Sequence, residues 1–379
     1  MVDCIALEKA LAKLEGPVVI AFGDPLLHTH VIVINNDIIN THNLMVNDKI
    51  EVNEEKIQKL CQDVFLEWNQ SQTAGGSAQN VLRTLQWLSN TNKKISMYYG
   101  AVGGDTNGTL IEALTMEAGL DTRYTVHPDQ PTGLCVSLVN ETFPTTAVHL
   151  GAAGTYTLDD LKKNDLPLET AKILYIENSF VIHSPAVAQE LVKQAEEKNI
   201  IIVFNIEGLH LLQEHHAIIC EMVACANIVF GSAEEMAAFA HILNIKYDHV
   251  LDIPFLLNSL KRITISVCNK TSDDWLRNGG IFIMSQGEFA PTVMVWGRHE
   301  HVEVNPIKLK GLALDKTGCR DALIAGFLAG VLAGWDPKHC LEFGCKVATF
   351  MITKLGVPPL KNLPPSYAER NFTNVCRIA

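Results

Sequence analysis

A short polar segment, Asp315-Lys-Thr-Gly-Cys-Arg-Asp321, holds the residue types best suited to chemistry, and it leads directly into an apolar run rich in Ala, Leu and Gly. This pattern is typical of a loop that feeds the N-terminus of a buried helix. The first turn of such a helix offers free backbone N–H groups and the positive end of the helix dipole, so it is a candidate anion site. Asp321 is therefore either a helix cap or a general base beside a phosphate.

A second glycine-containing turn, Thr73-Ala-Gly-Gly-Ser-Ala-Gln-Asn80, also opens an expected helix. Gly75 and Gly76 would allow a ligand close to the backbone, and Ser77 or Asn80 could hydrogen-bond it. Taken alone, this signal is weak, because most such turns are only tight turns.

Asp24 and His28 follow a continuous apolar run at residues 18–22, which is typical of a strand buried on both faces. Ligands in open α/β sheets bind outside the carboxyl ends of the strands. The sequence therefore places both side chains where a ligand is expected.

The composition limits the classes of protein that this chain can belong to. Its 379 residues are enough for one large α/β domain with an excursion or for two ordinary domains, and 47% are hydrophobic and 19% charged. The net charge of −12 provides no basic surface for nucleic acid, and no apolar run is long enough for a membrane span. The ten cysteines show no metal-binding spacing, and no signal-like segment begins the chain, so we expect reduced thiols in a cytosolic protein.

The pattern of elements predicts a mostly parallel sheet covered on both faces, because strands and helices alternate regularly from residue 156 onward. Residues 30–50 form an excursion from this pattern, residues 131–150 a hairpin, and residues 270–305 antiparallel edge strands. We expect helices at 5–15, 53–69, 108–118, 157–163, 184–198, 208–223, 232–242, 250–260, 337–355 and after Asp321, and strands at 18–22, 95–104, 172–176, 200–204, 227–230 and 263–267.

Six motifs occur in a fixed order along the chain: Gly23-Asp-Pro-Leu-Leu, Ala74-Gly-Gly-Ser-Ala-Gln-Asn80, Gly100-Ala-Val-Gly-Gly-Asp105, Gln130-Pro-Thr-Gly133, Phe230-Gly-Ser-Ala-Glu-Glu235 and Gly318-Cys-Arg-Asp321. Together they resemble the ribokinase-like family of sugar and nucleoside kinases, and within it the adenosine kinases. The resemblance extends from about residue 16 to residue 367.

The resemblance implies a three-layer α/β/α domain with a mostly parallel central sheet and a small β-rich lid. The large nucleotide-binding domain would comprise residues 16–25, 73–129 and 151–367. The lid would comprise residues 26–72 and 130–150, and residues 368–379 would be a tail.

The resemblance also implies a reaction, in which the 5′-hydroxyl of adenosine attacks the γ-phosphate of ATP with Mg²⁺ present and yields AMP and ADP, as in purine salvage. Such a protein would take a small nucleoside as its partner, with no nucleic acid or membrane, would be a monomer, and would be found in the cytoplasm and also in the nucleus.

The roles implied by the resemblance fall on specific residues. Asp321 matches the catalytic base, and Glu235 matches the acid that organises magnesium-bound water. The other implied positions are Gly318, Cys319 and Arg320 in the anion hole; Asp24, His28, Gly75, Gly76, Ser77, Asn80 and Cys135 for the nucleoside; and Ser232, Glu235 and Asp315 for the nucleotide.

Several of these positions depart from the family pattern. The family's Gly-Ala-Gly-Asp anion hole is Gly-Cys-Arg-Asp here, so Arg320 brings a side chain to a place of close approach. His28 replaces an aspartate that would accept two ribose hydroxyls, and losing one charge-assisted hydrogen bond costs roughly 1.5–3 kcal/mol. Pro144 stands where the family has a lid arginine, and Ser232 replaces the asparagine of an Asn-x-x-Glu motif. The family's Asp-Thr/Ser-Asn before the anion hole is Asp315-Lys316-Thr317 here.

Three hypotheses follow from this mixture of retained and altered residues. The chain is an active nucleoside kinase, a non-catalytic relative that binds a nucleoside or a protein, or a kinase with a sugar as its acceptor. Retained Asp321, Gly75, Gly76 and Glu235 favour the first, while the departures favour the second. The lid hairpin and Gln86-Trp87 argue against the third.

Overall fold

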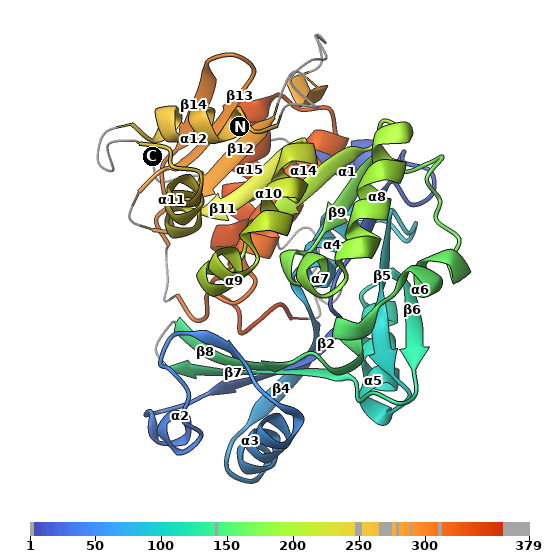
Figure 1. The fold of residues 1–379 in the computed structure, drawn as a ribbon, viewed down its shortest axis with the longest axis vertical. Helices are drawn as coiled ribbons and strands as arrows, with labels where there is room; N and C mark the ends of the chain where they lie inside the picture. The colour runs from blue at the N-terminus through green and yellow to red at the C-terminus, as the bar shows by residue number, and fades with distance from the viewer. Residues whose placement is uncertain are drawn as a thin grey trace.

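The structure is a computed structural model that describes residues 4–140, 143–246, 252–264, 275–277, 280–288, 290–309 and 313–358. Its larger part is built on a nine-stranded sheet, and Figure 1 shows helices on both sides of it. The strands are β1 (Val19–Phe22), β5 (Ser96–Gly103), β6 (Asp121–His127), β9 (Ile173–Ile176), β10 (Ile201–Asn205), β11 (Ile228–Ser232), β12 (Ile281–Ser285), β13 (Thr292–Trp296) and β14 (Glu300–Val304). Their order across the sheet is β14-β13-β12-β11-β10-β9-β1-β5-β6.

The seven strands from β12 to β6 are parallel, and the pairs β12–β13 and β13–β14 are antiparallel. β1 illustrates why a continuous apolar run suits this position. Val19 and Ala21 pack into the core on one face of the sheet, while Ile20 and Phe22 pack into the core on the other. The doubly covered α/β architecture expected from the sequence is thus confirmed.

Two groups of helices cover the sheet. One face packs against α1 (Cys4–Leu11), α4 (Ser77–Ser89), α14 (Cys319–Leu332) and α15 (Pro337–Met351). The other packs against α6 (Leu158–Lys163), α7 (Asn178–His183), α8 (Pro185–Glu197), α10 (His216–Cys225), α11 (Ala233–Ile242) and α12 (Ile253–Lys261). α9 (Leu209–Glu214) packs beside α11, and short 3-10 helices occupy Gly151–Thr155 and Trp275–Arg277.

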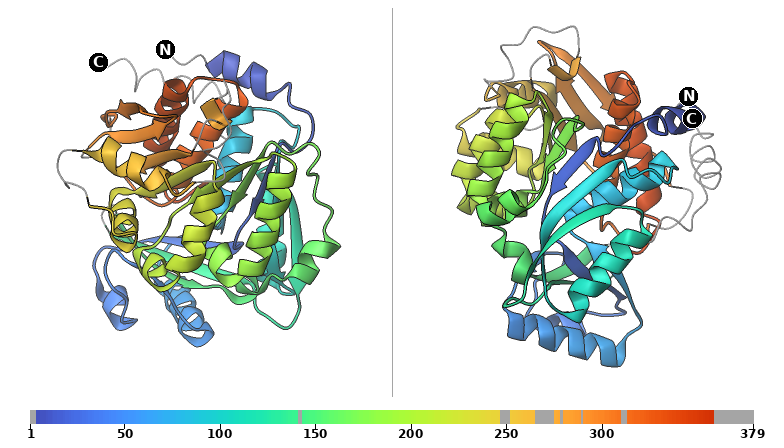
Figure 2. Two further views of the ribbon diagram at one scale, coloured as in Figure 1. Left: turned by 45° about the horizontal axis from the view of Figure 1, so that its top comes forward. Right: turned by 90° about the vertical axis from the view of Figure 1, so that its right-hand side faces the viewer.

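A second, five-stranded sheet forms the lid, and both views in Figure 2 show it at one end of the larger sheet. Its strands are β2 (Leu26–Ile32), β3 (Lys49–Glu51), β4 (Gln70–Gly75), β7 (Gly133–Asn140) and β8 (Phe143–His149), in the order β3-β8-β7-β2-β4. α2 (Asp37–Thr41) and α3 (Glu54–Glu67) pack on one face of this sheet through Ile39, Ile57 and Leu60. α5 (Thr106–Glu117) reaches β2 and β4 through Ile111.

The structure corrects several details of the sequence interpretation. β12 pairs parallel to β11, so only β13 and β14 are the antiparallel edge strands expected in this region. The helix expected at 208–223 is divided into α9 and α10, and β4, β6 and α7 were not expected. The tail at 368–379 and most of the strand expected at 263–267 lie outside the described residues.

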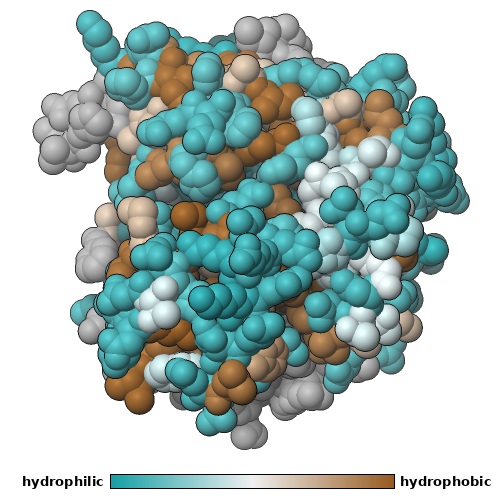
Figure 3. Space-filling view, turned by 60° about the horizontal axis from the view of Figure 1, so that its bottom comes forward, coloured by the Kyte–Doolittle hydropathy of each residue, from teal (hydrophilic) through white to brown (hydrophobic). Residues whose placement is uncertain are grey.

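The surface, the helix lengths and the cysteines can be compared with the expectations from composition. The face seen in Figure 3 is a mixture of hydrophilic areas and smaller hydrophobic patches. No helix within the described ranges is long and apolar enough to cross a membrane. The cysteines whose side chains the structure describes are free thiols.

Candidate active site

Asp321 lies in the first turn of α14, which begins after Gly318 in a left-handed conformation with φ of 75°. Its carboxylate accepts a hydrogen bond from Ser77 Oγ at 2.8 Å and another from Asn80 Nδ2 at 3.0 Å, both from the first turn of α4. The two glycine-containing turns found in the sequence therefore meet in space, and each supplies part of one site.

The environment of Asp321 favours a proton acceptor that works near neutral pH. Burial raises the pKa of Asp321 to about 6, and the charge of Glu207 adds to this, while the hydrogen bonds from Asn80 and Ser77 act in the opposite direction. A carboxylate with such a pKa is matched to general base catalysis at physiological pH.

The side chain of Arg320 extends from α14 to the first turn of α11. Its Nη1 donates to both carboxylate oxygens of Glu235, at 3.1 and 2.9 Å, and to the backbone oxygen of Ile206 at 3.2 Å. Glu235 also accepts from the backbone N–H groups of Ser232 and Gly208, so its carboxylate is already surrounded by donors.

The metal role expected for Glu235 does not fit this arrangement. Its oxygens are committed to Arg320 and to backbone donors, with Ser232 and Glu235 forming a reciprocal cap on α11. Within the described ranges, no group of three or more His, Cys, Asp or Glu side chains could hold a metal ion.

Asp315 shapes the loop that precedes α14. One of its oxygens accepts from the backbone N–H and the hydroxyl of Thr317, each at 2.8 Å, and the other accepts from the Gly356 N–H at 2.8 Å. The side chain is fully buried, so its observed contacts fix the loop between two parts of the chain. The Cys319 thiol lies against the backbone oxygen of the same aspartate at 3.8 Å, and burial raises its pKa.

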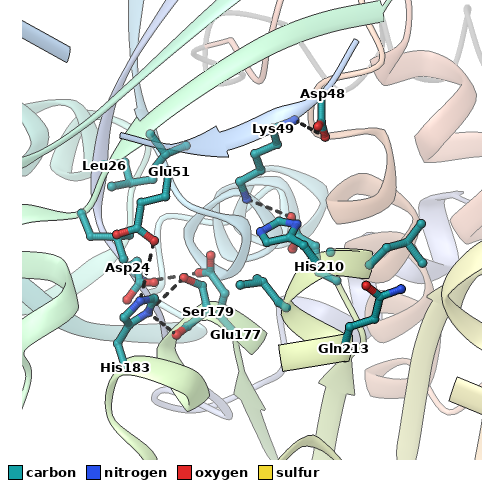
Figure 4. A pocket seen from close by; sticks show the side chains of 16 residues that line it. Asp24, Leu26, Asp48, Lys49, Glu51, Glu177, Ser179, His183, His210 and Gln213 are labelled. Atoms are coloured by element: carbon teal, nitrogen blue, oxygen red, sulfur yellow. Dashed lines mark hydrogen bonds and ion pairs between the residues drawn. The ribbon is translucent and has the colours of Figure 1, made fainter. Parts of the chain in front are cut away.

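A cavity of about 470 Å³ lies between the lid and the carboxyl ends of the central strands. Figure 4 shows its lining, with Asp24, Glu177, Ser179 and His183 grouped together and Lys49 reaching in from the lid. The apolar part of the wall comes from Leu26, Val148 and Leu150. The volume is that of a pocket for a small organic molecule.

Asp24 is the one expected site residue that lines this cavity. It is 1% exposed, and burial raises its pKa to about 6. Neither of its carboxylate oxygens has a hydrogen-bond partner among the described residues. Gly76, with φ of 105°, permits this packing, since a Cβ there would come within 2.3 Å of the Asp24 backbone oxygen.

Glu177 was not expected from the sequence, yet it holds the start of α4. Its two oxygens accept from the backbone N–H groups of Ser77 at 3.2 Å and Ala78 at 3.1 Å. Burial raises the pKa of Glu177 well above its ordinary value, and the neighbouring Asp24 raises it further. The helix terminus that the sequence offered to a ligand thus already faces a carboxyl group of the protein.

His28 and Cys135 lie in the lid, away from the cavity lining. His28 is buried, with Nε2 at 2.8 Å from Ser137 Oγ and its ring stacked on His30 at 3.9 Å between centroids. Burial lowers the pKa of His28 well below its usual value, so the imidazole is neutral at pH 7. His28 is therefore part of the buried interior of the lid. Gly75 lies directly against its ring, and Cys135 packs with Leu26, Val148 and Leu150 behind the cavity wall.

The missed residues carried a signal that sequence reasoning could have used. Glu177 directly follows β9, and Glu207 comes two residues after β10, as Asp24 comes two residues after β1. The rule that ligands bind outside the carboxyl ends of parallel strands applies to all three acids. Lys49, which pairs with Glu207 at 3.2 Å, begins the short strand β3 of the lid, which no motif marked.

Comparisons with known proteins agree with this architecture. The profile of the pfkB family carbohydrate kinases matches residues 44–361. Adenosine kinase 2 of Arabidopsis thaliana is 24% identical over 341 residues, covering 89% of this chain and 94% of that protein. The adenosine kinase of Schizophyllum commune is 27% identical over 340 residues, covering 88% and 94%.

Solved structures support the same fold. The adenosine kinase of Anopheles gambiae, in complex with a di(adenosine-5) tetraphosphate, superposes with a TM-score of 0.79 at 24% identity, covering 93% of this chain and 99% of that one. The adenosine kinase of Schistosoma mansoni in complex with 2-fluoroadenosine gives 0.79 at 23% identity, covering 91% and 98%. Because the family profile spans most of its length, this chain belongs to the pfkB family of carbohydrate kinases.

Proposed function

We propose that this protein is an ATP-dependent phosphotransferase of the adenosine kinase type, which phosphorylates the 5′-hydroxyl of adenosine to give AMP. Two relatives that match this chain over 94% of their own lengths are named adenosine kinases. Two similar solved structures are adenosine kinases in complex with ligands that contain adenosine or 2-fluoroadenosine. The observation that carries the proposal is Asp321, a buried carboxylate with a raised pKa at the start of α14, held by Ser77 and Asn80.

The chemistry proposed for this site is a direct phosphoryl transfer. The acceptor oxygen forms a bond to the γ-phosphorus of ATP, the bond from that phosphorus to the β,γ-bridging oxygen breaks, and ADP leaves. Asp321 takes the proton of the acceptor hydroxyl. Ser77 and Asn80 hold both oxygens of Asp321 in place, so that the base needs no reorientation when the acceptor binds.

The first turn of α14 fits a phosphate group. Its backbone N–H groups and helix dipole favour an anion, and Arg320 adds a positive charge beside them. The three hydrogen bonds that Arg320 forms all come from Nη1, so Nη2 and Nε have no partner in the described part of the chain. ATP, when bound, would supply the phosphoryl group here.

The ion pair between Arg320 and Glu235 favours a second candidate function, a nucleoside-binding protein without turnover. The guanidinium is tethered by three hydrogen bonds next to the helix terminus where the phosphate would bind. If that tether persists with ATP present, the acceptor binds but the donor does not approach closely enough for transfer.

The deciding experiment measures adenosine-dependent ADP formation by the purified full chain with ATP and Mg²⁺, beside the Asp321→Asn variant. Turnover by the wild type and its loss in the variant support the kinase. No turnover by either protein, with adenosine binding retained in calorimetry, would instead support the non-catalytic candidate. Absence of both turnover and adenosine binding contradicts the two candidates together.

A further inference from the structure

Two buried carboxyl groups in the cavity wall lack a positively charged partner. Asp24 is 1% exposed and Glu177 is 4% exposed, and neither forms an ion pair with any described residue. Among the described residues, neither oxygen of Asp24 has a hydrogen-bond partner, whereas Glu177 accepts only from backbone N–H groups. Buried carboxylates are normally paired or fully hydrogen-bonded, so this pair points to a group that is supplied from outside.

The cations near this pair are engaged elsewhere. Lys49 contacts Glu207 at 3.2 Å, and Arg320 contacts Glu235 at 2.9 Å. The closest carboxylate to His183 Nε2 belongs to Glu51, at 3.9 Å. None of these side chains compensates Asp24 and Glu177 at contact distance. Burial raises the pKa of both acids, so a bound ammonium group would stabilise their ionised forms at the deep side of the cavity.

The position of the pair relates it to the proposed chemistry. Ser77 donates its backbone N–H to Glu177 Oε1 and its hydroxyl to Asp321 Oδ1, so one residue separates the acid pair from the proposed base. The backbone N–H of Asp24 lies 3.4 Å from Glu177 Oε2. Ser77 therefore links the acid pair in the cavity wall to the proposed base, which itself lies behind the lining.

We propose that the cavity binds an acceptor that carries a protonated amine, with its ammonium group held by Asp24 and Glu177. The chemical class is an amino-substituted nucleoside or an amino sugar, which has a hydroxyl group for phosphorylation and an amine a few bonds away. This inference rests on the proposed phosphotransferase function and names the acceptor that the same site prefers.

An ammonium fits better than a metal ion or a neutral hydroxyl. No set of three or more metal-binding side chains occurs within the described ranges, whereas an ammonium needs only two or three acceptors at hydrogen-bonding distance. A hydroxyl could donate one hydrogen bond to Asp24, but it would leave the buried charge uncompensated. Leu26, Val148 and Leu150 provide an apolar wall for the carbon skeleton.

The test compares matched ligands by calorimetry on the full chain at pH 7, without ATP. The pairs are glucosamine against glucose, and 2′-amino-2′-deoxyadenosine and 3′-amino-3′-deoxyadenosine against adenosine. We expect the amine to bind at least about tenfold more tightly than its hydroxyl counterpart in at least one pair, with the preference reduced by added salt. Equal or weaker binding of the amine in all three comparisons overturns the proposal.

Variants of Asp24 and Glu177 test whether these two acids cause the preference for the amine ligands. Asp24→Asn and Glu177→Gln should each remove most of the preference for the amine, whereas Asp48→Asn should keep it, because Asp48 is an exposed acid at the same cavity. Thermal melting shows whether each variant is folded, and Asp24→Asn suffices if the other variant unfolds. A preference that survives in Asp24→Asn places the amine elsewhere and overturns the assignment.

Turnover separates this inference from the proposed function. If the amine compound binds selectively but no ADP forms with ATP, the acceptor class stands and the kinase activity fails. If adenosine is phosphorylated and the amines bind no better, the kinase activity stands and the acceptor class fails. If no compound binds, the acceptor class is overturned as well.

Discussion

Asp321 and Asp24 are two buried carboxyl groups with nearly the same acidity and opposite surroundings. Burial raises the pKa of each to about 6. Asp321 receives hydrogen bonds from Ser77 and Asn80, whereas neither oxygen of Asp24 has a hydrogen-bond partner among the described residues. The pKa alone therefore does not distinguish a positioned base from a binding group.

The different hydrogen bonding of Asp321 and Asp24 indicates different roles, one as a base and the other as a ligand-binding group. A base must stay in one geometry through the reaction, and fixed donors on both oxygens achieve this for Asp321. A carboxyl group that receives a ligand must keep its acceptor positions open, and Asp24 does so at the cost of an unsatisfied buried charge. Two carboxyl groups with similar pKa values can therefore have different roles: Asp321 is held rigidly, whereas Asp24 keeps its oxygens open for a ligand.

The largest effect is expected from removing the proposed base. Asp321→Asn should lower kcat by about 10²–10⁴-fold, because the variant cannot accept the hydroxyl proton. Acceptor binding should change little, since Asp321 does not line the cavity. Steady-state ADP formation measures kcat, and calorimetry on the same preparation measures acceptor affinity. If Asp321→Asn lost only acceptor affinity, Asp321 would be a binding group and not the base.

The pH dependence of the wild type offers an independent check. The base works only when deprotonated, so kcat/KM should rise with pH and reach half of its plateau near pH 6, the pKa of Asp321. Asp24 has the same pKa and contributes to the same rise through acceptor binding. The kcat profile, which reports the complex, should therefore retain the contribution of Asp321, and a flat kcat profile between pH 5 and 8 would exclude it.

Asp24 should also affect the stability of the fold. The pKa of Asp24 rises from 3.8 to about 6 on folding, so the protonated form is favoured in the folded state. Its contribution to stability is fully present below pH 4 and is lost as the pH rises through 6, a change of about 3 kcal/mol at about 1.4 kcal/mol per pKa unit. Asp24→Asn should therefore raise the free energy of unfolding at pH 8 and weaken its fall between pH 4 and pH 7.

Asp321→Asn is the matched comparison for this measurement. Its amide can keep a hydrogen bond to Asn80 and to Ser77, but both bonds lose the charge of the carboxylate, so we expect a smaller gain at pH 8 than for Asp24→Asn. Denaturant unfolding of the wild type and both variants at pH 5 and pH 8 tests this order. Equal gains would mean that the hydrogen bonds to Asp321 do not distinguish the two sites.

Arg320→Gly gives the third effect. Removing the tethered guanidinium frees the first turn of α14 for close approach by a phosphate, so we expect ATP affinity to increase about tenfold, which corresponds to about 1.4 kcal/mol. Titration of ATP with the wild type and the variant measures this change. Weaker ATP binding in the variant would show that Arg320 itself binds the phosphate through its remaining N–H groups.

The fold could be predicted largely from local patterns. The apolar run of β1 and the regular alternation after residue 156 follow from burial of a parallel sheet on both faces, and the structure confirms this layout. β4 was missed because Gln70–Gly75 is mostly polar, and it is a strand through its pairing with β2. Such pairing depends on tertiary contacts, to which local sequence patterns are insensitive.

The site was predictable only where motifs marked it. The glycine turns before Ser77 and Asp321 identified the two helix starts that meet, because a glycine before a helix is visible in the sequence. Glu177 and Lys49 had no such mark, since one follows a strand and the other lies in the lid. The ion pair of Arg320 with Glu235 joins residues 85 positions apart, and no spacing rule connects them.

The smallest effect is expected at the lid, where Lys49 pairs with Glu207 across the cavity with side-chain exposures of 49% and 30%. A pair this exposed is screened by solvent, so Lys49→Met should lower the free energy of unfolding by less than about 1 kcal/mol, and 0.5 M salt should remove the difference. Lys49→Arg, which keeps the charge, is the matched control. Since Glu207 raises the pKa of Asp321, the freed carboxylate should also shift the acid limb of kcat/KM toward higher pH. An unshifted limb would mean that Glu207 acts on Asp321 equally with and without its lid partner.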